Sequence, residues 1–166
     1  MLVLSLLACN SQNELPANEP LNSRFHDDQP SLSGDGTLLA FTTNRNGQEQ
    51  IALYDLEQRR FLDAPGLNRS GVIATNPSLS RTGRYLVYLT SVEGRLEIAL
   101  YDRITAQAEI LTRTYRHWVR NPQISADGRY ISFETARRGQ WDIEVLDRGP
   151  NIELDIADGT PLDVAP

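Results

Sequence analysis

The chain has 166 residues and a formal net charge of −6 at pH 7, from 22 acidic and 16 basic residues. This length accommodates one domain with a substantial core. An acidic balance with scattered arginines argues against a nucleic-acid-binding protein. Cys9 is the only cysteine, which excludes an intramolecular disulfide and a cysteine-based metal site.

The chain begins with a short apolar run that precedes Cys9. The run is too short to span a bilayer, which takes about 20 apolar residues, but it is typical of the end of a secretion signal. The stretch Leu6-Leu7-Ala8-Cys9 resembles the lipobox of bacterial lipoproteins, whose cysteine carries the lipid. We therefore expect residues 1–9 to be a signal segment with lipidation at Cys9. The protein would then lie in the periplasm or cell envelope and touch the membrane only through its lipid. The alternative is an apolar N-terminus with an incidental cysteine.

Residues 10–24 are rich in Asn, Gln, Glu, Pro and Ser and show no apolar periodicity. This composition predicts a flexible tether, whose root-mean-square reach is roughly 20 Å. Such a tether would hold the following domain near a membrane surface without embedding it.

Residues 25–166 are expected to form one domain built from three copies of a single pattern. Each copy opens at a proline and closes at an aspartate, and both markers recur at spacings of 47 and then 45 residues. A period of roughly 40–50 residues is typical of the blades of a β-propeller. The prolines are Pro30, Pro77 and Pro122, and the aspartates are Asp55, Asp102 and Asp147. The repeats span about 25–71, 72–117 and 118–160.

Each repeat predicts four strands in the same order. The proline opens the first strand, where its missing N–H suits a sheet edge. A glycine after this strand then predicts a hairpin turn, because such turns need a positive φ and glycine adopts one readily. The turns are Asp35-Gly36, Thr82-Gly83 and Asp127-Gly128. The second strand is apolar at nearly every position, which predicts burial on both faces; its copies are 38–42, 85–89 and 130–134.

A third strand ends at the closing aspartate, whose side chain can bond to backbone N–H groups of the next turn. A weaker fourth strand ends each repeat, at residues 61–62, 109–111 and 152–154. No segment has a convincing helical period. The sequence therefore predicts an all-β domain of β-propeller type, with three four-stranded blades.

The repeat resembles the WD-like repeats of the TolB β-propeller family. The shared pattern is Pro-x-apolar-Ser-x-Asp-Gly, an apolar strand, a glycine turn and Ile-x-apolar-Tyr-Asp, and it covers about residues 25–157. Full members of the family have six blades and an additional N-terminal α/β domain, neither of which is found in this sequence. The family also usually has an aromatic residue where Leu32, Leu79 and Ile124 stand. The resemblance implies a propeller fold and does not extend to the family's role in the Tol–Pal envelope system.

Three blades are fewer than the roughly four to eight with which propellers close. An open array of repeats needs caps or a partner to cover its ends. Two chains could form a six-bladed ring as a homodimer. Alternatively, the three sheets could close into a minimal propeller, or an open wedge could dock on another protein.

Candidate sites for chemistry are few. The cluster of His26 with Asp27 and Asp28 lacks a convergent ligand set, so we expect no metal and no other cofactor. No nucleophile motif of the Gly-x-Ser-x-Gly type occurs, and we expect no enzymatic activity. The stretch Tyr115-Arg116-His117-Trp118 is a candidate interaction loop, because aromatic residues and Arg are favoured at interface hot spots. The alternative is that its Trp packs between blades.

These observations favour a non-enzymatic, TolB-like envelope lipoprotein that binds an envelope protein or polymer through its propeller. Two alternatives stay open. One is an accessory or catalytic propeller of a hydrolase, whose acidic residues would converge at the central channel. The other is a binder of glycans or small ligands that uses the Tyr, Trp and Arg of the loops.

Overall fold

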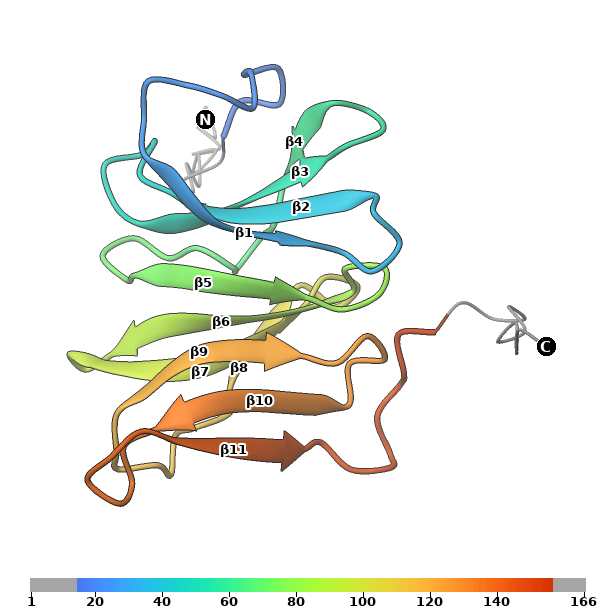
Figure 1. The fold of residues 1–166 in the computed structure, drawn as a ribbon. Helices are drawn as coiled ribbons and strands as arrows, with labels where there is room; N and C mark the ends of the chain where they lie inside the picture. Colours follow the sequence, from blue (N-terminus) through green and yellow to red (C-terminus); the bar gives the residue numbers. More distant parts are fainter. Residues whose placement is uncertain (1–14, 157–166) are drawn as a thin grey trace, which may run out of the picture.

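The fold is that of a computed structural model, which describes residues 15–156. The expected signal segment with Cys9, residues 10–14 and residues 157–166 lie outside the described residues. Within 15–156, eleven strands form three antiparallel sheets, which are stacked as blades 1, 2 and 3 in chain order (Figure 1). The prediction of an all-β fold with three propeller-type blades is confirmed. Residues 15–156 contain no helix of the length and apolarity that crossing a membrane requires.

The strands follow one another in each blade as a meander of hairpins. Blade 1 contains β1 (Asp27–Leu32), β2 (Leu38–Thr43), β3 (Gln50–Asp55) and β4 (Arg60–Leu62). Blade 2 contains β5 (Ala74–Leu79), β6 (Tyr85–Val92), β7 (Arg95–Asp102) and β8 (Gln107–Ile110). Blade 3 contains β9 (Val119–Ile124), β10 (Tyr130–Thr135) and β11 (Asp142–Asp147).

The first strand of each blade lies at an edge of its sheet, and β5 contacts both β1 and β9. Each of these strands has an irregular register around its proline. The residue before each proline has a positive φ: 51° at Gln29, 53° at Asn76 and 51° at Asn121. An edge strand with a bulge tolerates proline because no ladder hydrogen bond is lost.

Blade 3 lacks the fourth strand expected at residues 152–154, so that prediction is wrong. After β11 the chain runs back toward blade 2 (Figure 1). The Tyr85 hydroxyl donates to the Glu153 carbonyl at 2.6 Å, and Ser80 Oγ donates to the Asp155 carboxylate at 2.6 Å. These bonds hold the segment against blade 2. Among the described residues, β11 is left with β10 as its only sheet neighbour.

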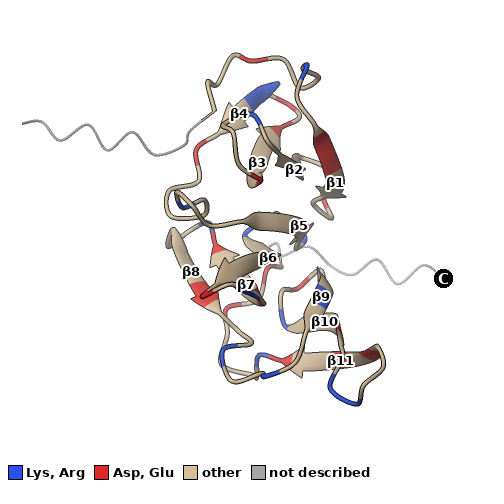
Figure 2. Ribbon diagram, turned by 90° about the vertical axis from the view of Figure 1, so that its left-hand side faces the viewer, with Lys and Arg blue, Asp and Glu red and all other residues tan. Residues whose placement is uncertain are grey.

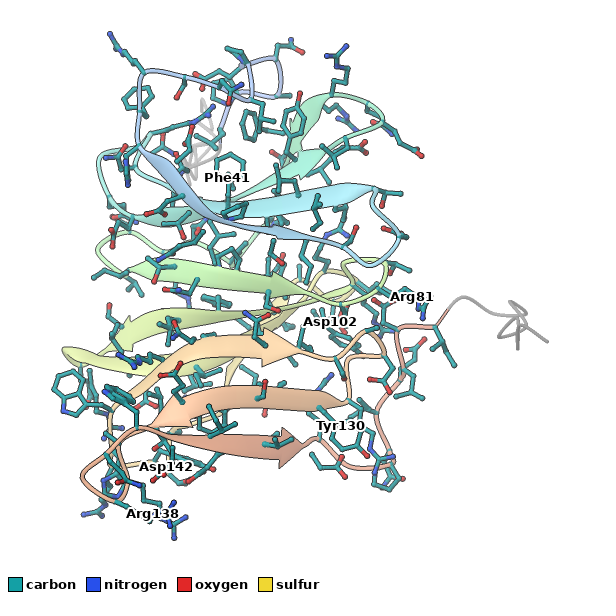
Figure 3. All side chains as sticks on the ribbon, viewed as in Figure 1. Phe41, Arg81, Asp102, Tyr130, Arg138 and Asp142 are labelled. Atoms are coloured by element: carbon teal, nitrogen blue, oxygen red, sulfur yellow. The ribbon has the colours of Figure 1, made fainter. Side chains whose placement is uncertain are left out.

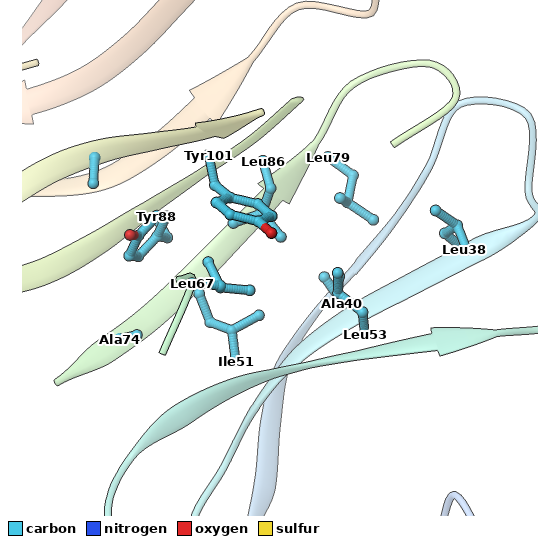
Figure 4. Close-up of a cluster of buried hydrophobic side chains, with 11 residues drawn as sticks. Leu38, Ala40, Ile51, Leu53, Leu67, Ala74, Leu79, Leu86, Tyr88 and Tyr101 are labelled. Atoms are coloured by element: carbon cyan, nitrogen blue, oxygen red, sulfur yellow. The ribbon is translucent and has the colours of Figure 1, made fainter. Parts of the chain in front are cut away.

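Two apolar clusters fill the spaces between the blades. The first lies between blades 1 and 2 and includes Leu53, Leu86 and Tyr101 (Figure 4). The second lies between blades 2 and 3 and includes Ile98 and Phe133. Residues 85–90 of β6 are therefore all buried, as expected. In β10 buried residues alternate with more exposed ones, because blade 2 covers only one of its faces. The prediction that this strand is buried on both faces is therefore wrong for β10.

The outer face of blade 1 is covered by the segment that precedes β1. Leu15 and Leu21 pack against the cluster that contains Phe41 and Phe61. Residues 15–24 were expected to belong to a flexible tether, but from Leu15 onward they contact the folded domain. We call residues 15–25 the N-terminal cap of blade 1.

Arg45 joins the N-terminal cap to blade 1, and its side chain is 1 % exposed. The guanidinium donates to the Pro20 carbonyl at 3.1 Å and to the Leu21 carbonyl at 2.5 Å. It also pairs with Asp27 at 2.8 Å and lies 4.9 Å from the ring centre of Phe61. Burial raises the pKa of Asp27, but hydrogen bonds from Arg45 and Thr43 outweigh it and hold that pKa below its usual value. Because the buried Arg45 side chain bonds both to the cap and to blade 1, the cap is part of the folded domain.

Two glycines with the same backbone conformation allow packing between blades to be measured. Gly128 (φ 80°) and Gly139 (φ 79°) both adopt a conformation that costs alanine roughly 1 kcal/mol. A Cβ on Gly128 would lie 2.4 Å from the Tyr85 ring, whereas a Cβ on Gly139 would meet nothing within 4 Å. We expect Gly128→Ala to lower the free energy of unfolding by about 2 kcal/mol and Gly139→Ala by about 1 kcal/mol. Urea unfolding followed by circular dichroism measures both; equal losses would contradict the close contact.

Candidate functional site on blade 3

The face of blade 3 that points away from blade 2 has no cover among residues 15–156. The exposed fractions of residues at equivalent positions of the three repeats show this difference. Ile51 is 2 % exposed and Ile98 is 0 % exposed, because each packs against the next blade. Ile143 stands at the same position of blade 3 and is 70 % exposed, and Val145 beside it on β11 is 64 % exposed.

The first residue of the second strand shows the same contrast. In blades 1 and 2 this residue lies under the glycine turn of the following blade: Gly83 lies on Leu38, and Gly128 lies on Tyr85. Tyr130 is the equivalent residue of blade 3, no further turn covers it among the described residues, and it is 42 % exposed. The face therefore carries the kind of side chains that pack between blades 1 and 2 and between blades 2 and 3, but no further blade covers it among the described residues.

Both tryptophans of the chain lie at the other end of this face. Trp118 is 62 % exposed and Trp141 is 45 % exposed. The Arg120 guanidinium lies 3.9 Å from the ring centre of Trp141, and its Nε donates to Glu134 at 2.6 Å. We call the whole surface the free face of blade 3. Its main residues are Trp118, Arg120, Tyr130, Trp141, Ile143 and Val145.

The candidate loop at residues 115–118 is divided between two environments. Tyr115 packs edge-on against Phe133, with ring centres 5.6 Å apart, on the side of blade 2. Arg116 and His117 are exposed, and Trp118 joins the free face. Trp118 was predicted as part of an interaction loop, whereas Trp141 and the exposed residues of β11 were not predicted.

Acidic and basic residues both occur on the strands and loops of blade 3 (Figure 2), and three arginines there pair with carboxylates: Arg120 with Glu134, Arg129 with Asp147 and Arg138 with Asp142. Figure 3 labels Tyr130 at one end of blade 3 and Arg138 with Asp142 at the other. A hydrogen bond from Arg138 lowers the pKa of Asp142 to about 2, and one from Arg129 lowers the pKa of Asp147 to about 2. These carboxylates stay ionised beside their arginines at neutral pH, so the surface carries little net charge.

The hairpin turns use their carboxylates internally. Asp35 accepts hydrogen bonds from Ser33 Oγ at 2.6 Å and from the Thr37 N–H at 3.0 Å. Asp127 accepts one from Ser125 Oγ at 2.5 Å. The bond from Ser125 holds the pKa of Asp127 below its usual value. At Asp35 burial raises the pKa of the carboxyl, but hydrogen bonds from Ser33 and Thr37 lower it by more. The pKa of Asp35 therefore also lies below its usual value. Carboxylates bonded in this way stabilise turns.

The other residues of the repeat motif also build the blades. Pro30, Pro77 and Pro122 lie in β1, β5 and β9. Gly36, Gly83 and Gly128 have φ values of 75°, 69° and 80°. The closing aspartates accept backbone N–H bonds from the turns that follow, at 2.7 Å for Asp55, 2.9 Å for Asp102 and 2.8 Å for Asp147.

The polar cluster at the start of β1 is small. His26 Nε2 lies 3.2 Å from Asp28 Oδ2, and both side chains are partly exposed. Within the described part of the chain, no three His, Cys, Asp or Glu side chains gather closely enough to hold a metal ion.

Comparison with solved structures identifies the architecture. TolB from Acinetobacter baumannii has a TM-score of 0.60 and 24 % sequence identity, over 78 % of this chain and 31 % of that one. The β-propeller domain of the Trilobed protease from Pyrococcus furiosus has a TM-score of 0.53 and 18 % identity, over 74 % and 39 %. A puromycin-hydrolysing peptidase from Mycobacterium tuberculosis has a TM-score of 0.57 and 16 % identity, over 83 % and 22 %.

The likeness is one of fold. No family model and no curated protein matches the chain. The chain spans about a third of the TolB chain to which it is similar. The propeller resemblance stated from the repeats is supported at this level, and the similar structures comprise both TolB and peptidase propellers.

Proposed function

We propose that this chain is a non-enzymatic interaction module of the cell envelope, which binds a protein partner through the free face of blade 3. The proposal rests chiefly on the exposure of Ile143, at a position that the next blade buries in blades 1 and 2. Contiguous exposed apolar surface marks interaction sites. Trp, Tyr and Arg are the residues most enriched at binding hot spots, and Trp118, Arg120, Tyr130 and Trp141 supply them.

The expected lipid anchor would orient the module. Cys9 precedes Leu15 by six residues, an extended reach of roughly 20 Å. Leu15 packs in the N-terminal cap on the outer face of blade 1. A lipid on Cys9 would therefore hold blade 1 toward the membrane. Blade 3 is at the opposite end of the stack (Figure 1), so its free face would be open to a partner.

Photo-cross-linking in cells tests the proposal. A photoreactive phenylalanine analogue replaces Ile143 on the free face, and a matched variant carries it at Ile104. Both isoleucines are 70 % exposed, but Ile104 lies in the turn after β7 of blade 2. We expect a protein adduct of discrete mass from position 143 and none from position 104. Adducts from neither position, or equal adducts from both, would contradict the proposal, and a polymer smear from position 143 would point to a polymer partner instead.

The competing function is an accessory or catalytic propeller of a hydrolase. Peptidases occur among the proteins that share the fold. Their likeness to this chain, at 16 % identity for the mycobacterial peptidase, concerns the fold alone. Hydrolysis of peptide substrates by the purified chain, abolished by a single acidic substitution, would favour this function over the interaction module.

A further inference from the structure

We infer that the partner seated on the free face of blade 3 is a second copy of this chain, packed face to face about a two-fold axis. The inference rests on the proposed function, because it needs the free face to be the interaction surface. It adds the identity of the partner.

The chemistry of the free face is that of a sheet packed on a sheet. Ile143, Val145 and Tyr130 stand where the other blades meet a neighbouring sheet. Sheets that pack face to face interdigitate such side chains across a layer about 10 Å thick. A sheet is therefore a better occupant of this face than a small ligand, and the free face of a second copy is such a sheet.

Charge favours a copy of the same surface. Arg120 pairs with Glu134 at 2.6 Å, and Arg129 pairs with Asp147 at 2.8 Å. Both of these arginines are paired with an anion of their own chain, so two copies of the surface would meet without repulsion between them. Oppositely charged groups could also exchange partners across the axis. A strongly charged foreign partner would find no complementary field here.

The N-terminal cap limits the assembly to two chains. A ring of two half-propellers would place blade 3 of one chain against the outer face of blade 1 of the other. That face is already covered by Leu15 and Leu21, and Arg45 holds the cap in place from a buried position. Between the two ends of the stack, residues 15–156 thus leave only the free face of blade 3 open, and a single self-complementary face closes at the dimer.

The free face of blade 3 is small for a protein–protein interface. Strand rise and strand spacing give three strands of six residues dimensions of roughly 20 Å by 14 Å. This is smaller than the roughly 800 Å² per partner of a standard interface. A face of this size is typical of a weak, transient contact, so we expect a dimer that dissociates readily on dilution and forms where an anchor concentrates the chain at a membrane surface.

Sedimentation velocity tests the inference on the full chain carrying Cys9→Ser, which removes lipid attachment and the native thiol. We expect a monomer–dimer equilibrium across the micromolar range. Ile143→Arg should weaken it at least about tenfold, since it buries a charge at the contact. Ile104→Arg, at an equally exposed isoleucine of blade 2, should leave it unchanged. A monomer at every concentration, or equal effects of the two substitutions, would overturn the inference.

A single cysteine distinguishes the two-fold contact from a ring. Ser132 lies on β10, the middle strand of blade 3, and its β11 neighbour is Val145. In the Cys9→Ser background, Ser132→Cys should give a covalent dimer with a short bismaleimide, because a two-fold axis through the face brings the two positions together. In a six-bladed ring the two positions would lie half a ring apart, so a dimer without this cross-link would overturn the inference. A monomer that still forms photo-adducts with another protein from position 143 would reject the second copy while leaving the proposed function standing.

Discussion

Replacing Asp155 with alanine is expected to lower the free energy of unfolding by about 3 kcal/mol, more than most surface substitutions. Asp155 is 5 % exposed, and its carboxylate accepts hydrogen bonds from Ser80 Oγ, the Thr82 N–H and Thr82 Oγ1 at 2.6–2.8 Å. Hydrogen bonds to a charged group contribute about 1.5–3 kcal/mol each. Chemical unfolding of Asp155→Ala measures the loss.

The reason for this contribution lies in the repeat. In blades 1 and 3 the hairpin supplies its own carboxylate, at Asp35 and Asp127. The equivalent residue of blade 2 is Thr82, and Asp155 reaches it from the C-terminal segment. Thr82→Asp should therefore restore most of the stability lost in Asp155→Ala. In the wild-type background the same substitution should destabilise, because two carboxylates would share one site. Additive losses in the double variant would contradict this account.

Replacing Arg45 with methionine is expected to destabilise the chain by about 3 kcal/mol and to release the N-terminal cap. Breaking one partner of a buried ion pair costs about 3–5 kcal/mol, and we take the lower end because the Asp27 side chain is 23 % exposed. Methionine keeps most of the packing on Phe41 and Phe61 and removes the donors to Pro20 and Leu21. Unfolding in urea measures the stability.

Limited proteolysis reports the cap itself. In Arg45→Met we expect new cleavage within residues 15–25, while the blades resist. Arg138→Met is the matched control, because Arg138 also pairs with an aspartate at 2.8 Å, but it lies outside the cap and its side chain is 71 % exposed. Unchanged cleavage in Arg45→Met, or equal cleavage in both variants, would show that the cap does not depend on Arg45.

The arrangement within each blade could be predicted because it depends on local signals. Prolines, the Asp-Gly turns and the apolar second strands act over a few residues, and each signal recurs in three copies. The predicted third strands accordingly appear in β3, β7 and β11. The prediction of a fourth strand was wrong in blade 3. There the C-terminal segment is held by Asp155, which bonds to Ser80 and Thr82, more than seventy positions earlier in the chain.

The candidate site was harder to predict because exposure depends on neighbours. Ile51, Ile98 and Ile143 are the same residue in the same pattern, and only the position of the blade in the stack exposes the last. The N-terminal cap was missed for a similar reason. Leu15 and Leu21 are isolated apolar residues in a polar stretch, without a period that would reveal a buried face. Trp118 was the one residue of the free face that composition indicated.

Tryptophan fluorescence of the Cys9→Ser chain tests the open face most directly, because Trp118 and Trp141 are the only tryptophans and both lie on it. The account predicts solvent-exposed, red-shifted emission that acrylamide quenches readily in dilute solution. On concentration the emission should shift to the blue and become protected, and Ile143→Arg should abolish this change. Blue-shifted, protected emission at dilutions where sedimentation shows a monomer would mean that the face is covered within one chain, and would contradict the account.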